Sequence, residues 1–236
     1  MNLAILRINK TKKPPCRTKV NVRQPWLADM GFVCDAPVWA TPQQNGFTLT
    51  LQDERNTPEH GKLIHVGLEN TKPSLILNFA NNFYVDGLSG GDFLAAKYDY
   101  GVIQAQKLPQ AQAYYLVSSR EYEAFLQMCG GWLNDAGFVP DTVTTVSVAD
   151  NCITLSAWQD ATASYGDIVK FARKRKYQII QPKRNQHITV VDIPEYILCR
   201  VGLGKGDICG VRYELGIITL FKPDLQQLEL AVPEAL

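Results

Sequence analysis

Short runs in which apolar and polar residues alternate, separated by tight turns, make up most of the chain. The runs are rich in Val, Ile, Thr, Phe and Tyr, residues that favour a pleated, half-buried surface. Between paired runs stand dipeptides that contain Asn or Gly, which accept the positive φ of a two-residue hairpin turn. The four predicted turns are Asn45-Gly46, Tyr100-Gly101, Asn151-Cys152 and Leu215-Gly216. The pattern predicts a mainly β fold.

Each predicted hairpin follows a short amphipathic segment that ends in a glycine, the residue that most easily takes the left-handed conformation at a helix end. These glycines are Gly31, Gly87, Gly137 and Gly202. Trp26 and Trp132 begin two of the segments, and we expect both to anchor a short helix in the core. An exposed, base-stacking role is the alternative.

The same order, a short segment that ends in glycine and then a hairpin, recurs because the chain contains an internal repeat. Gln24–Val38 aligns without gaps with Gly130–Thr144, 106 positions later, and the two share the pattern Trp-Leu-x-Asp-x-Gly-Phe-Val-x-Asp. Val85–Ile103 aligns within Cys199–Ile218 at an offset of 115, so that Gly87 matches Gly202 and Ile103 matches Ile218. Fixed-period self-similarity is typical of repeated structural units. The sequence therefore predicts four copies in the order A-B-A′-B′, with halves at 16–109 and 113–224.

The change of offset places about nine extra residues in the second half, where a basic helix is expected over 164–176. Ser164 and Asp167 form a capping box there, and Tyr165, Ile168, Val169 and Ala172 share one predicted apolar face. We also expect a helix over Arg120–Met128, at the start of the third copy. Residues 1–15 are expected to be a basic segment before the first strand, and 225–236 a C-terminal tail.

Charge is segregated along the chain, although the formal net charge is only +1. Residues 7–23 and 170–184 contain no acid and hold 14 of the 24 basic residues, which leaves 10 bases against 23 acids elsewhere. Spaced cations of this kind neutralise phosphates. The predicted nucleic-acid-binding residues are Lys10, Lys12, Lys13, Arg17, Lys19, Arg23, Lys170, Arg173, Lys174, Arg175, Lys176, Lys183 and Arg184. A solvated helix face is the plainer interpretation of the second run.

Two stretches resemble a known family. Ile188–Leu220, with Ile-Pro before a short helix and then Gly-Leu-x-x-Gly-Asp and a hairpin, resembles the SpoVT/AbrB swapped-hairpin domain. Lys19–Leu51, with Arg-x-Pro-Trp-Leu and Gly-Phe, resembles the SymE-type branch. The resemblance implies that copies exchange hairpins, so that each half is a pseudo-dimeric barrel within one chain. It also implies DNA contacts from the lead-in strands, by Arg17, Lys19 and Arg23 in the first copy and by Lys183 and Arg184 in the fourth.

These observations favour binding of double-stranded DNA with low sequence specificity, by a bacterial, cytoplasmic regulator or nucleoid-type factor linked to a toxin–antitoxin locus. A protein-interaction scaffold with duplicated barrels is the first alternative, and a SymE-like toxin that targets RNA is the second. Salt-dependent binding to arbitrary DNA would distinguish the first interpretation from both.

Catalytic and cofactor-binding patterns are missing from the sequence. Gly202–Asp207 lacks the Gly-Lys-Ser/Thr of a phosphate loop, and the three histidines have no metal-ligand spacing. The six scattered cysteines include no C-x-x-C pair and are expected to be reduced thiols in small apolar sites. No apolar run approaches the length of a membrane span. We therefore expect a protein that is not an enzyme and needs no metal, cofactor or membrane.

Overall fold

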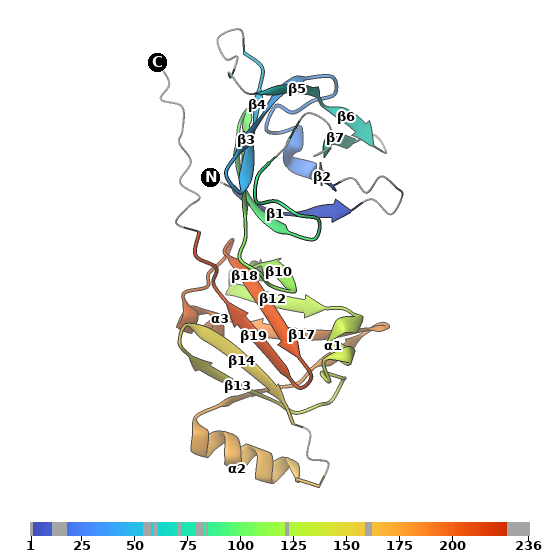
Figure 1. Cartoon of the computed structure of the whole chain (residues 1–236). Helices are drawn as coiled ribbons and strands as arrows, with labels where there is room; N and C mark the ends of the chain where they lie inside the picture. Colours follow the sequence, from blue (N-terminus) through green and yellow to red (C-terminus); the bar gives the residue numbers. More distant parts are fainter. Residues whose placement is uncertain are drawn as a thin grey trace. The chain divides into compact units, whose positions relative to one another are not determined.

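The computed structural model describes residues 2–10, 18–53, 58, 61–69, 72–78, 83, 85–120, 123–158 and 162–225. The chain divides into two compact units, Met1–Gln110 with Asp224–Leu236, and Ala111–Pro223. Strands predominate in both units, which confirms the mainly β fold predicted from the alternating pattern (Figure 1).

In unit 1 the described residues form a nine-stranded sheet in the order β5-β3-β4-β9-β8-β1-β2-β7-β6. One short 3-10 helix, η1 (Pro25–Leu27), follows β2. The strands are β1 (Asn2–Lys10), β2 (Thr18–Val22), β3 (Pro37–Gln43), β4 (Gly46–Leu51), β5 (Lys62–His65), β6 (Gly67–Glu69), β7 (Lys72–Asn78), β8 (Phe93–Asp99) and β9 (Val102–Lys107).

The described residues of unit 2 form a six-stranded sheet, β10-β18-β19-β14-β13-β15, and a four-stranded sheet, β11-β12-β17-β16. Its strands are β10 (Ala113–Leu116), β11 (Ser118–Arg120), β12 (Glu123–Cys129), β13 (Thr144–Ala149), β14 (Cys152–Ala157), β15 (Gln178–Ile180), β16 (Lys183–Asn185), β17 (Ile188–Pro194), β18 (Ile208–Glu214) and β19 (Ile217–Phe221). Its helices are α1 (Gly131–Asp135), α2 (Tyr165–Arg175), α3 (Glu195–Leu198) and the 3-10 helix η2 (Cys199–Val201).

Both units are nearly closed into a barrel, because single chain segments run from one sheet end to the other. In unit 1 the end strands β5 and β6 are separated by Val66, whose N–H donates to the carbonyl of Ala36 (3.1 Å). In unit 2 the segment Gln181–Pro182 joins β15 to β16, and Val117 joins β10 to β11, so both pairs of sheet ends are linked.

The two units pair their strands in matching registers. Val38 lies opposite Leu51, and Thr144 lies opposite Ala157, the same pair moved by 106 positions. Asp99 lies opposite Val102, and Glu214 opposite Ile217, moved by 115. The connection that contains α2 separates β14 from β15, where unit 1 has the connection from β4 to β5. This is the pattern that an internal repeat predicts; the duplication itself stays a prediction.

Three local expectations were wrong. A helix was predicted over Arg120–Met128, but Arg120 ends β11 and the residues from Glu123 on form β12, which pairs with both β11 and β17. Residues 2–10, expected to precede the first strand, form β1 between β8 and β2. Two hairpin turns lie one residue earlier than expected, at Gln44-Asn45 and Asp150-Asn151, because Gly46 and Cys152 already pair across the sheet.

Both residues of the turn Asp150-Asn151 have positive φ, 49° and 58°, as a two-residue type I′ hairpin turn requires. The glycines expected to end the short helical segments also have positive φ; these are Gly31, Gly87, Gly137 and Gly202. The backbone at these positions is therefore the one that the Asn and Gly signals predict.

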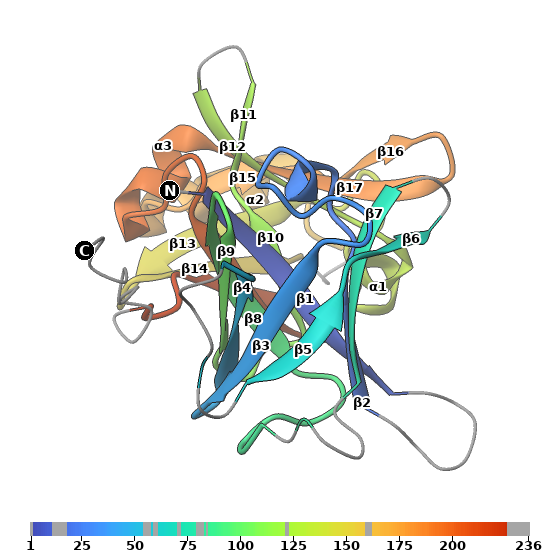
Figure 2. The ribbon, with the colours of Figure 1, turned by 90° about the horizontal axis from the view of Figure 1, so that it is seen from above.

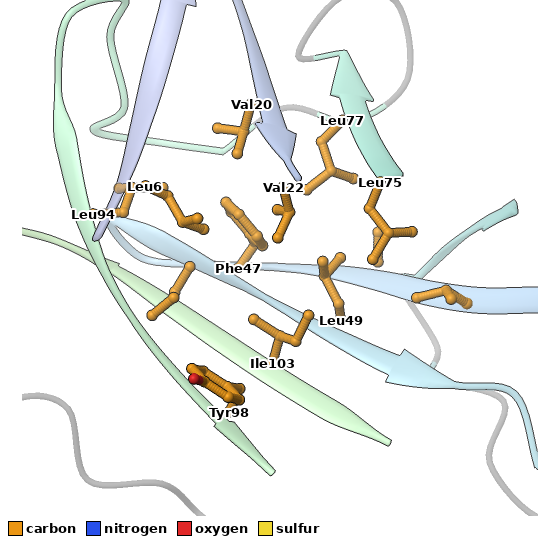
Figure 3. Close-up of a cluster of buried hydrophobic side chains, with 14 of the residues drawn as sticks. Leu6, Val20, Val22, Phe47, Leu49, Leu75, Leu77, Leu94, Tyr98 and Ile103 are labelled. Atoms are coloured by element: carbon orange, nitrogen blue, oxygen red, sulfur yellow. The ribbon is translucent and has the colours of Figure 1, made fainter. Parts of the chain in front are cut away.

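Each unit has its own hydrophobic core. In unit 1 side chains from six strands point toward one another, among them Leu6, Val20, Phe47, Leu75 and Leu94 (Figure 3). Burial of such side chains contributes roughly 1.5–3 kcal/mol each to folding.

The two tryptophans attach the short helices to these cores. Trp26 stacks on Tyr98, with ring centroids 3.6 Å apart, and Trp132 packs at 4.6 Å against Tyr213. Both tryptophans are half-buried and lie against their unit's core. Since a neighbouring tyrosine covers one face of each indole, these positions suit anchoring better than base stacking.

A lysine closes the Gly-Asp turn in each unit. The Asp92 carboxylate accepts the N–H of Ser89 (2.7 Å) and pairs with Lys107 (2.9 Å). Asp207 likewise accepts the N–H of Gly204 (2.8 Å) and pairs with Lys222 (2.9 Å). The lysine ammonium also donates to a backbone carbonyl, that of Gly87 in one unit and of Gly202 in the other. The Gly-Asp motif is therefore a structural turn.

Replacing Asp207 should destabilise unit 2 more than replacing its partner Lys222. Lys222→Ala removes a partly exposed ion pair and should cost less than about 1 kcal/mol. Asp207→Ala also leaves the Gly204 N–H without its acceptor and should cost about 1–3 kcal/mol. Urea unfolding measures both free energies, with the exposed Lys205→Ala as control. Equal losses for the two variants would contradict this assignment.

The described cysteines differ from the expectation that they fill small apolar sites. Cys34, Cys129 and Cys199 are exposed, Cys152 is half-buried, and Cys209 is buried; all are free thiols. Cys16 lies outside the described residues. Burial raises the pKa of Cys209 to about 12. A hydrogen bond from the thiol of Cys34 to the Asp35 carboxylate (3.4 Å) raises the pKa of Cys34.

Thiol labelling at pH 8 should therefore separate the cysteines, because the thiolate is the reactive species. Cys129 and Cys199 should react first, Cys34 more slowly, and Cys209 only after denaturant is added. Peptide mass spectrometry identifies the labelled positions. Rapid labelling of Cys209 in the native protein would show that its burial is wrong.

Candidate nucleic-acid interface

The expected basic helix exists as α2, and its start is capped as the sequence predicts. The Ser164 hydroxyl accepts the Asp167 N–H (3.3 Å) and donates to the Asp167 carboxylate (2.6 Å). Lys176, in the left-handed conformation at φ 58°, ends the helix. Ile168 and Ala172 are buried and Val169 is half-buried, but Tyr165 is 57% exposed and does not belong to the apolar face, contrary to expectation.

Aromatic side chains complete the attachment of α2. Phe171 packs edge-on against Trp158, with centroids 5.3 Å apart, and against Tyr177 at 6.1 Å. The Arg175 guanidinium carbon lies 6.0 Å from the Phe171 ring centroid, which fits a weak cation–π contact. The sequence gives no signal of this cluster, since Trp158 and Tyr177 lie in the connections before and after α2. The cluster fixes the orientation of the helix relative to β15, the strand that follows.

The cations of α2 are turned to solvent. Lys170, Arg173, Lys174, Arg175 and Lys176 are all exposed. Among the described residues, no carboxylate forms an ion pair with any of them. Positive charge in the last turn is also favoured by the helix dipole. The helix therefore holds an unneutralised basic surface on the outside of unit 2, in contact with β15, the strand that follows it (Figure 1).

Two further predicted cations lie on β16, which forms a hairpin with β17 (Figure 2). Lys183 and Arg184 are exposed, as is His187 in the turn. Seven positions separate Lys176 from Lys183, so these two residues lie at most about 25 Å apart. The exposed cations of α2 and β16 are therefore within one chain-length of each other, and we refer to them together as the α2–β16 surface.

The first basic run is only partly described. The backbone of Lys10 ends β1 and pairs with Thr18, and Lys19 on β2 lies opposite Asn9. Lys19 is half-buried and Arg23 is exposed. Lys12, Lys13 and Arg17 lie outside the described residues. Arg23 also takes part in an interaction of its own.

Unit 2 also contains a pocket of about 490 Å³ that the sequence did not indicate. Its lining comes from Glu123–Phe125, from Ile180–Gln181, from Lys183, and from Asp192–Glu195. The Gln127 amide donates to the Asp192 carboxylate at 3.0 Å. No single sequence motif spans these segments, which are up to about 70 positions apart, so no local signal reveals the pocket.

The described residues contain no group of three His, Cys, Asp or Glu side chains that could hold a metal. Nor does any helix among them have the length and apolar character needed to cross a membrane. Burial raises the pKa of Tyr114 to about 12, and Tyr114 packs edge-on against Phe221, which identifies it as a core residue of unit 2.

Compared with models of protein families and with curated proteins, the chain gives no match to either. The resemblance to SpoVT/AbrB and SymE-type domains therefore stays an expectation from the motifs.

The Ser164 cap should control the order of the α2–β16 surface. Ser164→Ala should cost about 1 kcal/mol, because it removes the acceptor of the Asp167 N–H. Hydrogen exchange should become faster over the first turns of α2 and stay unchanged in β17. Ser147→Ala, a hydroxyl removed from β13, is the control. Unchanged exchange in α2 would mean that the cap does not hold the helix.

Proposed function

We infer that the chain binds the phosphate backbone of nucleic acid, double-stranded DNA in first place, through the α2–β16 surface. The observation that carries this proposal is the run of exposed cations over 170–184, which has no acid of its own and no ion-paired carboxylate among the described residues. Each cation that meets a phosphate releases condensed counterions, which makes binding favourable and sensitive to salt.

The sequence separation of the cations is compatible with contact with several phosphates of one duplex. Lys176 and Lys183 lie at most about 25 Å apart, the length of roughly seven base pairs at about 3.4 Å per step. Backbone contacts of this kind position a protein on DNA without reading its sequence. Low sequence specificity follows, as expected for a nucleoid-type factor or a regulator in the bacterial cytoplasm.

The motif resemblance supports the same surface. In SpoVT/AbrB-like domains, lead-in strands carry the cations that contact DNA, and here Lys183 and Arg184 lie on β16, paired with the lead-in strand β17 of the fourth copy. Lys19 lies on β2, the lead-in strand of the first copy. A link to a toxin–antitoxin locus follows from the SymE-type motif alone.

A protein-interaction scaffold is the second candidate, favoured by apolar side chains beside the cations. Tyr165 is 57% and Phe171 39% exposed. Aromatic and arginine side chains are enriched together at protein interfaces. In this case α2 would bind an acidic, partly apolar surface of a partner.

The decisive variant replaces Lys170, Arg173, Lys174 and Arg175 with Gln. It should weaken binding to every duplex alike and reduce the slope of log affinity against log salt by about 0.9 for each phosphate that is no longer neutralised. The fold should persist, because exposed substitutions usually change stability by less than about 0.5 kcal/mol. Fluorescence anisotropy with two unrelated duplexes, each measured over a salt series, gives the slopes.

The matched control is the double variant Arg200→Gln with Lys205→Gln, two exposed cations of unit 2 outside the basic run. It should leave the salt slope nearly unchanged. If the quadruple variant binds with the parent's slope, duplex binding by α2 is refuted. If the same variant no longer binds a purified partner protein, the scaffold becomes the better-supported function.

A further inference from the structure

The pocket of unit 2 lies at a seam between two sheets. The chain passes from β15, at the end of the six-stranded sheet, through Gln181–Pro182 to β16, at the end of the four-stranded sheet. The lining of the pocket crosses this seam, from Ile180 on β15 to Asp192–Pro194 on β17. Its volume of about 490 Å³ falls within the usual range of about 300–1,000 Å³ for ligand pockets.

Strand edges are unpaired at this seam. In the described pairings, β17 contacts β16 only from Ile188 to Val190, so Val191–Pro194 has no partner on that side. β15 pairs with β13 alone among the described strands. Unpaired strand edges accept an added strand, the commonest way in which a sheet binds an extended peptide.

Part of the wall of the pocket is apolar. Ala124 is 4% and Ile193 0% exposed, and the half-buried Phe125, Ile180 and Pro194 complete the wall. A ligand that covers the half-buried Phe125, Ile180 and Pro194 removes apolar surface from water, which favours binding.

Charge distinguishes this pocket from the α2–β16 surface beside it. Three carboxylates, of Glu123, Asp192 and Glu195, line the pocket, together with the single ammonium of Lys183. The pocket is therefore net negative, although it borders the most basic run of the chain. An occupant with positive charge is favoured, and a phosphate backbone is repelled.

We propose that this seam binds an extended peptide segment of a partner protein in which basic side chains alternate with apolar ones. The backbone of the peptide pairs with the free edge of β17. Its lysine or arginine side chains lie on the sheet face that Phe125, Asp192 and Pro194 share. Their stems cover Phe125 and Pro194, and their charges meet Glu123 and Glu195. Its apolar side chains lie on the opposite face. The proposal does not rest on the proposed nucleic-acid surface, although the two sites share Lys183.

The probe is a fluorescein-labelled peptide, Val-Lys-Val-Lys-Val, titrated with the full chain at low salt and followed by anisotropy. The matched peptides Val-Glu-Val-Glu-Val and Val-Gln-Val-Gln-Val test the charge. Val-Lys-Val-Lys-Val with N-methyl groups on alternate residues tests the strand pairing. We expect the unmethylated lysine peptide to bind tightest and the glutamate peptide to bind least.

Protein variants locate the site. Glu123→Gln with Glu195→Gln should weaken the lysine peptide by about five-fold, as expected for two partly exposed ion pairs. Lys183→Gln should strengthen it by about two-fold, because a like charge is removed. The control Glu214→Gln removes one carboxylate of unit 2 outside this pocket and should change nothing. All variants should keep the parent's melting temperature.

Failure of the peptide proposal can be distinguished from failure of the duplex-binding proposal. Glu123→Gln with Glu195→Gln should leave the salt slope on DNA unchanged or slightly steeper, whereas the α2 variant should leave peptide affinity within about two-fold. Equal binding of the lysine and glutamate peptides would overturn the proposal. So would full affinity of the N-methylated peptide, or of the lysine peptide for the Glu123 and Glu195 double variant.

Discussion

Each unit depends on the pairing of two hairpins that are far apart in the sequence. Leu49 on β4 lies opposite Ile103 on β9, and Leu155 on β14 lies opposite Ile218 on β19; none of the four is exposed to solvent. A single hairpin has no other strand to cover this face, and an isolated hairpin is marginally stable in water. The two hairpins of a unit must therefore form together, and neither half of a unit is expected to fold alone.

This pairing leaves the connections between strands free to vary. The segment from β14 to β15 passes outside the paired hairpins, so α2 fits there while the register stays intact on either side of it. Only Ile168 and Ala172 of the helix are buried, and Ser164 caps it locally. Because the barrel does not need the rest of α2 for stability, the remaining surface carries cations that would be costly to bury.

Local signals predicted well those features that local interactions determine. The helix-ending glycines and the Ser164 cap depend on neighbours in the sequence, as do the hairpin turns, although two of the four turns lie one residue earlier than predicted. The helix prediction was wrong at Glu123–Cys129. The Glu, Ala, Leu, Gln and Met residues of this segment favour a helix, but pairing with β11 on one side and β17 on the other imposes a strand. The seam pocket was not predictable either, since only the fold brings Glu123 and Glu195 to one site.

Lys183 connects the two proposed sites, because it belongs both to the basic run and to the lining of the acidic pocket. The three carboxylates of the pocket weaken the attraction of Lys183 for phosphate, because their negative charges repel a phosphate placed near the Lys183 ammonium. A basic peptide in the seam would neutralise those carboxylates and so strengthen the phosphate contacts of β16. By linkage, nucleic acid bound to β16 would strengthen peptide binding by the same factor. The short segment Gln181–Pro182, which closes the barrel, would then also couple a protein partner to the nucleic-acid surface.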